Sequence, residues 1–138
     1  MNCASFAIFA AAQMLFPAAD TKPEGYDGAK VRVEDGVVDK PTIIGEFHFG
    51  SLDRGTMTSG LVPCRDMKER MAKYKAYVRH ALQDEHLVGV HWFFWSDMPL
   101  TGWMDGEDFG NGVMDVTDNP HPEMVEATRE LARELYRQ

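Results

Sequence analysis

The sequence has little of several features that would place it in particular protein classes. It has two cysteines in 138 residues, Cys3 and Cys64, too few for a disulfide framework and without the spacing of metal ligands. No apolar run reaches the roughly 20 residues that a membrane span needs, and the net negative charge argues against an anionic membrane surface, so we expect no membrane partner. Positive charge is scarce, because 14 Lys and Arg stand against 22 Asp and Glu, a formal net charge of −8. This balance argues against nucleic acid as a partner.

Positive charge is also missing from the start of the chain, where an apolar, alanine-rich segment runs from Cys3 to Ala19. A signal peptide normally carries Lys or Arg before its apolar core. We therefore favour structure, with a buried strand over residues 2–9, and the segment does not fix the compartment. Residues 17–39 are predicted to form a loop. Glu-Asp-Gly turn chemistry between Val-rich flanks predicts a small hairpin within it at 31–38.

An apolar, β-branched stretch opened by Pro41 and closed by Gly50 predicts a buried strand that contains one carboxylate, Glu46. Strict alternation divides it into two faces, one with Ile44, Glu46 and His48, the other with Ile43, Phe47 and Phe49. A buried carboxylate without a partner is costly. Glu46 is therefore either a catalytic or ligand-binding group or half of a structural ion pair, and the residues alone leave both open.

A helix is predicted to begin after Asp66, because Glu69 stands three residues later at capping-box spacing. Its apolar stripe is Met67, Met71, Tyr74, Val78, Ala81 and Leu82, and its other faces carry Lys68, Arg70, Lys73, Lys75 and Arg79. Residues 87–95 predict a second strand, apolar on both faces, which is typical of a parallel strand buried between layers.

A long loop over 96–120 and a final helix follow. Asp, Gly and aromatic residues fill the loop; exposed indoles among carboxylates are typical of a sugar-binding cleft, although buried loop anchors would look similar. Pro122 is suited to the first turn of the helix. The expected buried stripe is Met124, Thr128, Leu131 and Leu135, with Val125, Ala132 and Tyr136. The order strand, helix, strand, helix indicates βα units and a parallel sheet.

Several motifs, in order, resemble the agarase-type glycoside hydrolases of family 50, which are related to the family 42 β-galactosidases. They are Gly45-Glu46-Phe47-His48-Phe49-Gly50, Leu52-Asp53-Arg54-Gly55, His91-Trp92-Phe93, Pro99-Leu100-Thr101-Gly102, Asp105-Gly106-Glu107 and Asp115-Val116-Thr117-Asp118. The chain departs from the family pattern at Phe94, Met98 and Trp103, where the family usually has glutamine, glutamine and arginine. The resemblance therefore does not fix the sugar.

The resemblance implies an α/β fold: the C-terminal two to three βα units of a (β/α)8 TIM barrel, incomplete in itself. Residues 40–138 would be the last two units. Residues 1–39 would be a partial strand and connecting loop, with 2–9 as the sixth barrel strand. A full barrel needs on the order of 250 residues. An open sheet edge invites association, so we expect a partly disordered monomer or an aggregate unless a missing N-terminal barrel part acts as partner.

The resemblance also implies retaining hydrolysis of β-galactosidic bonds, with Glu46 as nucleophile at the end of the seventh strand and Trp92 flooring the sugar near the end of the eighth. The implied substrate-binding residues are His48, His91, Trp92, Trp95, Asp97, Trp103 and Glu107. The partner is a carbohydrate, and no metal or cofactor is expected. The family's acid/base glutamate follows an asparagine, and this chain has no Asn-Glu dipeptide.

Two other functions stay open at this point. The chain could be a catalytically inactive remnant or a carbohydrate-binding surface that uses Trp92, Trp95 and Trp103. It could also be a small secreted α/β protein in which Glu107 or Asp97 serves as the acid partner of Glu46. The third interpretation requires one of those two carboxylates to approach Glu46 in the folded chain.

Overall fold

The computed structural model describes residues 31–33, 36–38 and 41–136. The strand expected over 2–9, and the apolar segment that contains it, lie outside the described residues. None of the described helices is long and apolar enough to cross a membrane.

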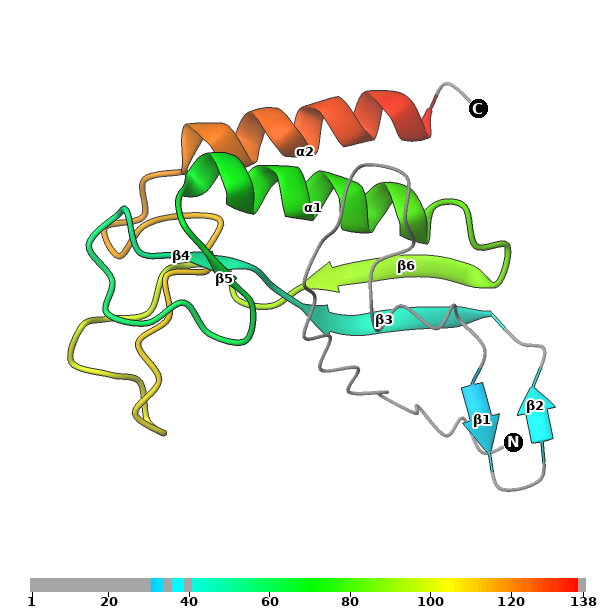
Figure 1. Ribbon diagram of the computed structural model, residues 1–138, viewed down its shortest axis with the longest axis horizontal. Helices are drawn as coiled ribbons and strands as arrows, with labels where there is room; N and C mark the ends of the chain where they lie inside the picture. The colour runs from blue at the N-terminus through cyan, green and yellow to red at the C-terminus, as the bar shows by residue number, and fades with distance from the viewer. Residues whose placement is uncertain (1–30, 34–35, 39–40, 137–138) are drawn as a thin grey trace.

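A short hairpin precedes the main body, as the turn chemistry predicted. Strand β1 (Val31–Val33) pairs with β2 (Gly36–Val38) in antiparallel orientation, with Val31 opposite Val38. Figure 1 shows it as a separate ribbon below the larger strand pair.

The main body is a strand–helix–strand–helix arrangement with parallel strands (Figure 1). Strand β3 (Thr42–Phe47) pairs in parallel with β6 (Leu87–Trp92), and helix α1 (Met67–Ala81) makes the crossover between them. The predicted βα order and parallel pairing are therefore confirmed. The sheet of the described residues is open, with two strands, and does not close into a barrel.

Helix α2 (Pro122–Leu135) lies on the same side of the β3–β6 pair as α1 (Figure 1). The prediction that β6 is buried on both faces is wrong for the described part of the chain. Because both helices cover one face, alternate side chains on the other stay accessible, with Ile43 at 47% and Val88 at 64% exposure.

The strict alternation predicted for β3 is also wrong. Ile44 packs against the same core cluster as Phe47 and Phe49, although alternation puts it on the opposite face. The reason is a register irregularity between Ile44 and Phe47, where the β3–β6 pairing skips two residues. Such irregularities re-aim side chains and often lie beside active sites. The two residues between Ile44 and Phe47 are Gly45 and Glu46.

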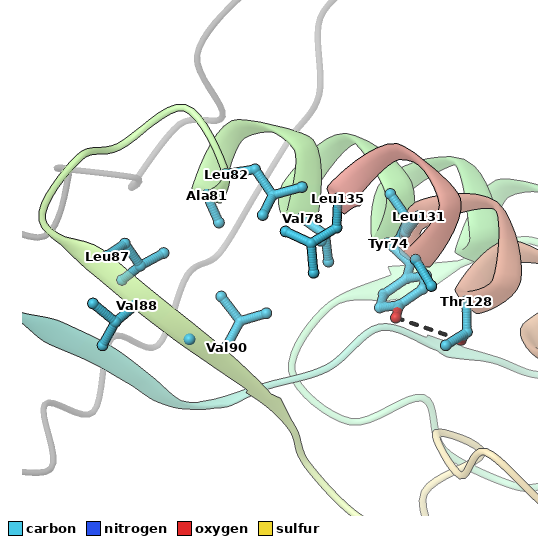
Figure 2. Close-up of a pocket in the computed structure, with 12 residues that line it drawn as sticks. Tyr74, Val78, Ala81, Leu82, Leu87, Val88, Val90, Thr128, Leu131 and Leu135 are labelled. Atoms are coloured by element: carbon cyan, nitrogen blue, oxygen red, sulfur yellow. Dashed lines mark hydrogen bonds between the residues drawn. The ribbon is translucent and has the colours of Figure 1, made fainter. Parts of the chain in front are cut away.

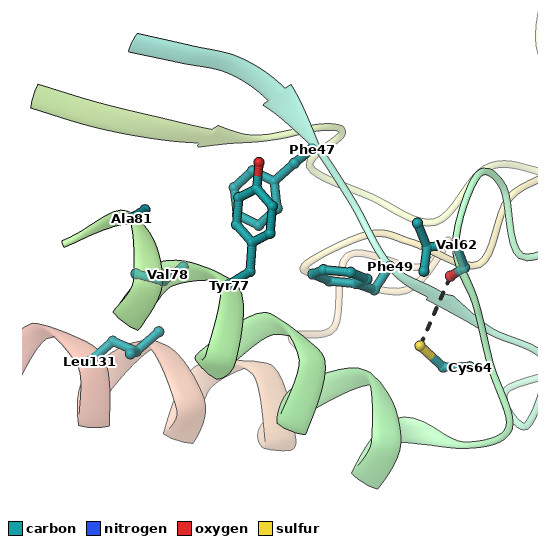
Figure 3. Packing of buried hydrophobic residues seen from close by; sticks show 8 residues of the cluster. All are labelled: Phe47, Phe49, Val62, Cys64, Tyr77, Val78, Ala81 and Leu131. Carbon is teal, nitrogen blue, oxygen red and sulfur yellow. Dashed lines mark hydrogen bonds between the residues drawn. The ribbon is translucent and has the colours of Figure 1, made fainter. Parts of the chain in front are cut away.

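The core lies between the strand ends and α1, and aromatic rings dominate it. Phe47 stacks on Tyr77 with ring centroids 4.5 Å apart, and Phe49 meets Tyr77 edge-on at 6.0 Å. Figure 3 shows these rings between β3 and α1, with Val78, Ala81 and Leu131 extending the cluster toward α2. Burying a side chain of this size contributes roughly 1.5–3 kcal/mol, so this cluster fixes α1 against the end of β3.

Helix α1 begins where the capping residues predicted. The Asp66 carboxylate accepts a hydrogen bond of 2.8 Å from the Glu69 N–H. The reciprocal bond is displaced by one residue, because Glu69 Oε2 accepts from the Arg65 N–H at 3.0 Å. Asp53 satisfies a further free donor by accepting from the Met67 N–H at 3.0 Å.

The helix stripes differ from prediction at a few positions. In α1, Tyr77 and Arg70 are buried as well as the predicted methionines, so Arg70 does not lie on a solvated face. In α2 the buried residues are Met124, Ala127 and Leu131. Leu135 and Tyr136 were expected in the stripe but are 46% and 85% exposed, and Thr128 and Ala132 are exposed as well. Of these four, Thr128, Ala132 and Leu135 line an open groove between α2 and β6.

Two short parallel strands, β4 (Gly50–Ser51) and β5 (Pro63–Cys64), close the loop after β3. Between β6 and α2 the described chain has no regular element, as expected. Isolated bridges hold this loop: Thr58 to Phe109, Ser96 to Met114 and Met114 to Pro120.

Candidate active site

Glu46 lies at the C-terminal end of β3, half-buried and on the irregular stretch of the strand. Within the part of the chain that the structure describes, no hydrogen bond or ion pair reaches its carboxylate. A structural ion pair was one of the two interpretations of this residue, and the described residues contain none for it. The described residues therefore give no support to the ion-pair interpretation.

A second carboxylate, Glu107, lies in the electrostatic field of the first. Burial raises the pKa of Glu107, and the negative charges of Asp105 and Glu46 raise it further. Like charges disfavour ionisation of a neighbouring carboxyl group. The loop after β6 therefore carries a carboxyl group whose pKa is raised, in part by the charge of the β3 carboxylate.

A tight backbone turn fixes Glu107. Its carbonyl accepts from the Trp103 N–H at 2.8 Å, and the Trp103 carbonyl accepts from the Gly106 N–H at 2.9 Å. The Asp105 side chain closes the turn by accepting from the Glu107 N–H at 3.2 Å. Gly106 has φ of +89°, a conformation that side chains disfavour. These hydrogen bonds therefore join the backbones of Trp103 and Glu107.

His48 lies beneath the site and is 3% exposed. Its Nε2 accepts from the Leu61 N–H at 3.0 Å, and its ring lies between those of Phe93 and Phe109, at centroid distances of 5.4 and 5.8 Å. Burial, followed by the nearby Arg70 charge, lowers the pKa of His48 to about 4. The ring is therefore neutral near pH 7 and carries its proton on Nδ1.

The neighbouring residues His91 and Trp92 on β6 lie in different environments. His91 is exposed on β6. Trp92 packs into the core, edge-on to Phe47 at 5.2 Å and to Tyr74 at 5.3 Å. Its Nε1 donates to the Asn111 carbonyl at 2.8 Å. Trp92 thus contacts the helix side of the sheet.

Two accessible aromatic rings come from the loop after β6. Trp95 is 69% and Trp103 is 43% exposed. Phe94 meets Trp103 edge-on, with ring centroids 4.7 Å apart and planes at 78°. Exposed indole faces beside carboxylates can stack on sugar rings, and these two indoles provide such faces.

Asp97 is buried and bonded within the chain, at 6% exposure. Its Oδ1 accepts from the Gly112 N–H at 2.7 Å, and its Oδ2 lies 2.8 Å from His121 Nε2. Oδ1 therefore ties two parts of the loop together and Oδ2 ties the loop to the start of α2, whereas the sequence predicts Asp97 as a substrate-binding residue.

The sequence reasoning missed Arg70, Asn111 and His121, which are all buried. Arg70 is 1% exposed, donates to the Gly112 carbonyl at 2.6 Å and lies 5.5 Å from the Trp92 ring centroid. Its place three residues after Met67 on the helix stripe was a signal for burial. No comparable signal marks Asn111 or His121. In the described residues no group of three or more His, Cys, Asp or Glu could hold a metal ion.

Known proteins resemble part of this chain, although no protein-family model matches it. β-Agarase B and β-agarase A of Vibrio sp. (strain JT0107) are each 41% identical to it over 101 residues, which is 72% of this chain. The chain spans about a tenth of the length of these curated relatives.

Solved structures give the same likeness. The structure of an exo-β-agarase matches with a TM-score of 0.69 and 43% identity over 71% of this chain and 13% of that one. The structure of PfGH50B matches with a TM-score of 0.70 and 39% identity over 72% of this chain and 14% of that one.

Proposed function

Because this chain is related to a segment of the agarase-type glycoside hydrolases, we propose that it carries the nucleophile half of a retaining β-galactosidic hydrolase site. The nucleophile is Glu46. The observation that carries this proposal is a half-buried carboxylate without a partner in the described residues, at the C-terminal end of a parallel strand. In (β/α)8 barrels the reacting residues come from those strand ends.

The chemistry needs two carboxyl groups roughly 5–5.5 Å apart across the anomeric carbon. Glu46 attacks that carbon, and the bond to the leaving oxygen breaks as the second carboxyl group protonates that oxygen. Water, deprotonated by the same second group, then releases the sugar with its configuration retained. The resemblance assigns the second group to a segment not present in this sequence.

Within this chain Glu107 is the carboxyl group that best fits the acid role. Its raised pKa favours the protonated form, and the Glu46 charge contributes to that shift. Asp97 fits less well, because both of its oxygens are bonded to Gly112 and His121. The sugar contacts that we propose in addition are the exposed His91, Trp95 and Trp103. The buried His48 and the core residue Trp92 would support these three residues from the interior of the protein.

We propose that the substrate is an uncharged oligosaccharide of the β-galactoside type. No Lys or Arg occurs between Arg79 and Arg129, a stretch that contains the whole loop after β6. Without a cation in that loop, sulfate or carboxylate groups on a sugar would meet only acidic side chains.

The barrel itself is also a proposal. Residues 40–138 would be its last two βα units. The helices cover one face of the β3–β6 pair, and an open groove of about 410 Å³ runs along β6 between the helices. Figure 2 shows Leu87 and Val90 facing Leu131 and Leu135 across this groove. Its apolar lining fits a further βα unit, which the longer relatives have the length to supply.

A binding role without hydrolysis is the second candidate, favoured by the exposure of Trp95 and Trp103. One experiment separates the two. A 2-deoxy-2-fluoro-β-galactoside with a leaving group acidic enough to depart unprotonated would trap the glycosyl-enzyme without an acid catalyst. We expect mass spectrometry to find the label on the peptide that contains Glu46.

The test uses the chain itself and a Vibrio β-agarase in which this chain replaces the matching segment. Glu46→Gln should abolish labelling in both, and the exposed Glu85→Gln is the matched control. Labelling of the chain alone would show that the site needs no further strand for glycosylation. An active chimera that keeps its label after Glu46→Gln would refute the assignment, and retained sugar binding with no label in either protein would favour the binding role.

A further inference from the structure

Phe94 has a backbone conformation that bulky side chains rarely adopt. Its φ is +76°, and the described residues contain one other non-glycine residue with positive φ, Asp118. Aspartate tolerates this region because its short polar side chain bonds locally, whereas phenylalanine has no such compensation. Outliers of this kind persist only where the surroundings hold them, and they cluster at functional sites.

The surroundings of Phe94 are two rings. The chain leaves β6 with the Phe93 N–H bonded to the Phe47 carbonyl at 2.9 Å, and then turns at Phe94. The turn puts the Phe94 ring against Phe93, at a centroid distance of 5.4 Å, and against Trp103, at 4.7 Å. The next residue, Trp95, is left 69% exposed.

Trp103 links this ring contact to the backbone of Glu107. The Trp103 N–H is bonded to the Glu107 carbonyl. Gly102, with φ of +80°, packs against Gly106, and a Cβ added to Gly102 would lie 3.2 Å from the Gly106 Cα. Phe94 therefore touches a residue whose backbone is bonded to the backbone of Glu107. Trp103 keeps 43% of its surface exposed, so the contact leaves part of the ring open to a ligand.

We propose that Phe94 is a positioning residue that holds Trp103 as a fixed aromatic wall beside Glu107, for a hexose residue that presents its C–H face. The left-handed backbone directs the Phe94 ring onto Trp103, and the pair sets the orientation of the turn from Trp103 to Glu107. This inference rests on the proposed function for its ligand, but its geometric part can be measured without any sugar.

The first measurement is amide hydrogen exchange of the purified chain. Phe94→Gly removes the ring but suits a positive φ, so it separates the ring from the backbone conformation. We expect the amides of Trp103 and Gly106 to exchange at least tenfold faster in Phe94→Gly, with exchange in α1 unchanged. Leu100→Ala, an exposed change in the same loop, should alter neither. Unchanged protection in Phe94→Gly would overturn the proposal.

Trp103→Ala removes the other ring of the pair. If the two rings act together, these amides should exchange no faster in the double variant, Phe94→Gly with Trp103→Ala, than in either single variant. Additive increases in the exchange rate would show that the two rings act independently and would contradict the proposal. Trp103→Phe, which retains an aromatic contact, should restore much of the protection. A variant that fails to fold would also lose protection in α1, which identifies it. The proposal would then be decided by the single variant that still folds and by Trp103→Phe.

The second measurement is binding of an agaro-oligosaccharide to the chimeric agarase. We expect Phe94→Gly to weaken binding about tenfold while the rate of fluorosugar labelling at saturation changes little, because Phe94 acts through Trp103 and not on Glu46. An equal loss in binding and labelling rate would assign it a general structural role. If the proposed function is wrong, binding and labelling are both absent while the exchange result stands.

Discussion

Arg70 on α1 donates a hydrogen bond of 2.6 Å to the carbonyl of Gly112, 42 residues later in the chain. The N–H of the same glycine donates to Asp97 at 2.7 Å, so buried groups hold both polar atoms of one residue. An added Cβ at Gly112 would lie 2.1 Å from the Asp97 nitrogen, which leaves no room for a side chain there. This clamp ties the loop after β6 to both helices, because Asp97 also bonds His121 before α2.

We expect Arg70→Met to destabilise the chain by about 2–4 kcal/mol. The replacement fills similar space, but it leaves the Gly112 carbonyl without its donor and Asp97 without a nearby positive charge. Urea unfolding measures the free energy of unfolding of each variant. Lys68→Met, at an exposed neighbouring position, is the matched control. Equal stability of Arg70→Met and the unchanged chain would show that the clamp contributes nothing net.

Local signals in the sequence predicted the elements well. Asp66 and Glu69 gave the start of α1, Pro122 gave the start of α2, and the order of apolar segments gave the parallel pair. These features depend on residues close in sequence, where periodicity and capping chemistry are reliable.

The parts that the sequence did not reveal depend on contacts between distant residues. Alternation failed at Ile44 because the irregularity in β3 is a property of its pairing with β6. Arg70 was assigned to solvent by its charge, yet a backbone carbonyl 42 residues away and the Trp92 ring make its burial favourable. Asp97 was assigned to the substrate by its loop, but its partner His121 lies 24 residues away.

The stability of the chain should fall as the pH falls from about 6.5 toward 4, with His48 as a cause. Burial and the Arg70 charge lower its pKa from 6.5 to about 4, so the unfolded chain binds a proton in this window that the folded chain refuses. The contribution of His48 is complete above the unfolded pKa and declines below it, by roughly 3 kcal/mol in total.

Urea unfolding at a series of pH values measures this slope. His48→Gln, whose amide oxygen can still accept from the Leu61 N–H, should flatten it. An NMR titration of the His48 ring with a midpoint near 6.5 in the folded chain would contradict the prediction.

The isolated chain should associate through the groove between β6 and the helices, where the described residues leave the edge of β6 unpaired. Leu135, in the wall of this groove, is 46% exposed. Exposed apolar surface next to an unpaired parallel strand edge favours association. Leu135→Glu should raise the monomer fraction in analytical ultracentrifugation by placing a charge in the groove. Met104→Glu, at 88% exposure and outside the groove, should not. A monomer with a sharp cooperative thermal transition would count against this expectation.

The proximity of Glu46 and Glu107 can be tested through their charges. Burial raises the pKa of Glu107 most, and the Asp105 and Glu46 charges add to it. Glu46→Gln removes one of the like charges without changing the size of the side chain, so the pKa of Glu107 should fall toward its ordinary value while staying above it, because burial and Asp105 remain. A carbon-detected NMR titration of the Glu107 carboxyl group measures the change, and Glu85→Gln should leave it where it was. If Glu46→Gln also leaves it there, the two carboxyl groups do not share a field. In that case Glu107 cannot be the acid partner in this chain, and the proton must come from a strand that the longer relatives carry.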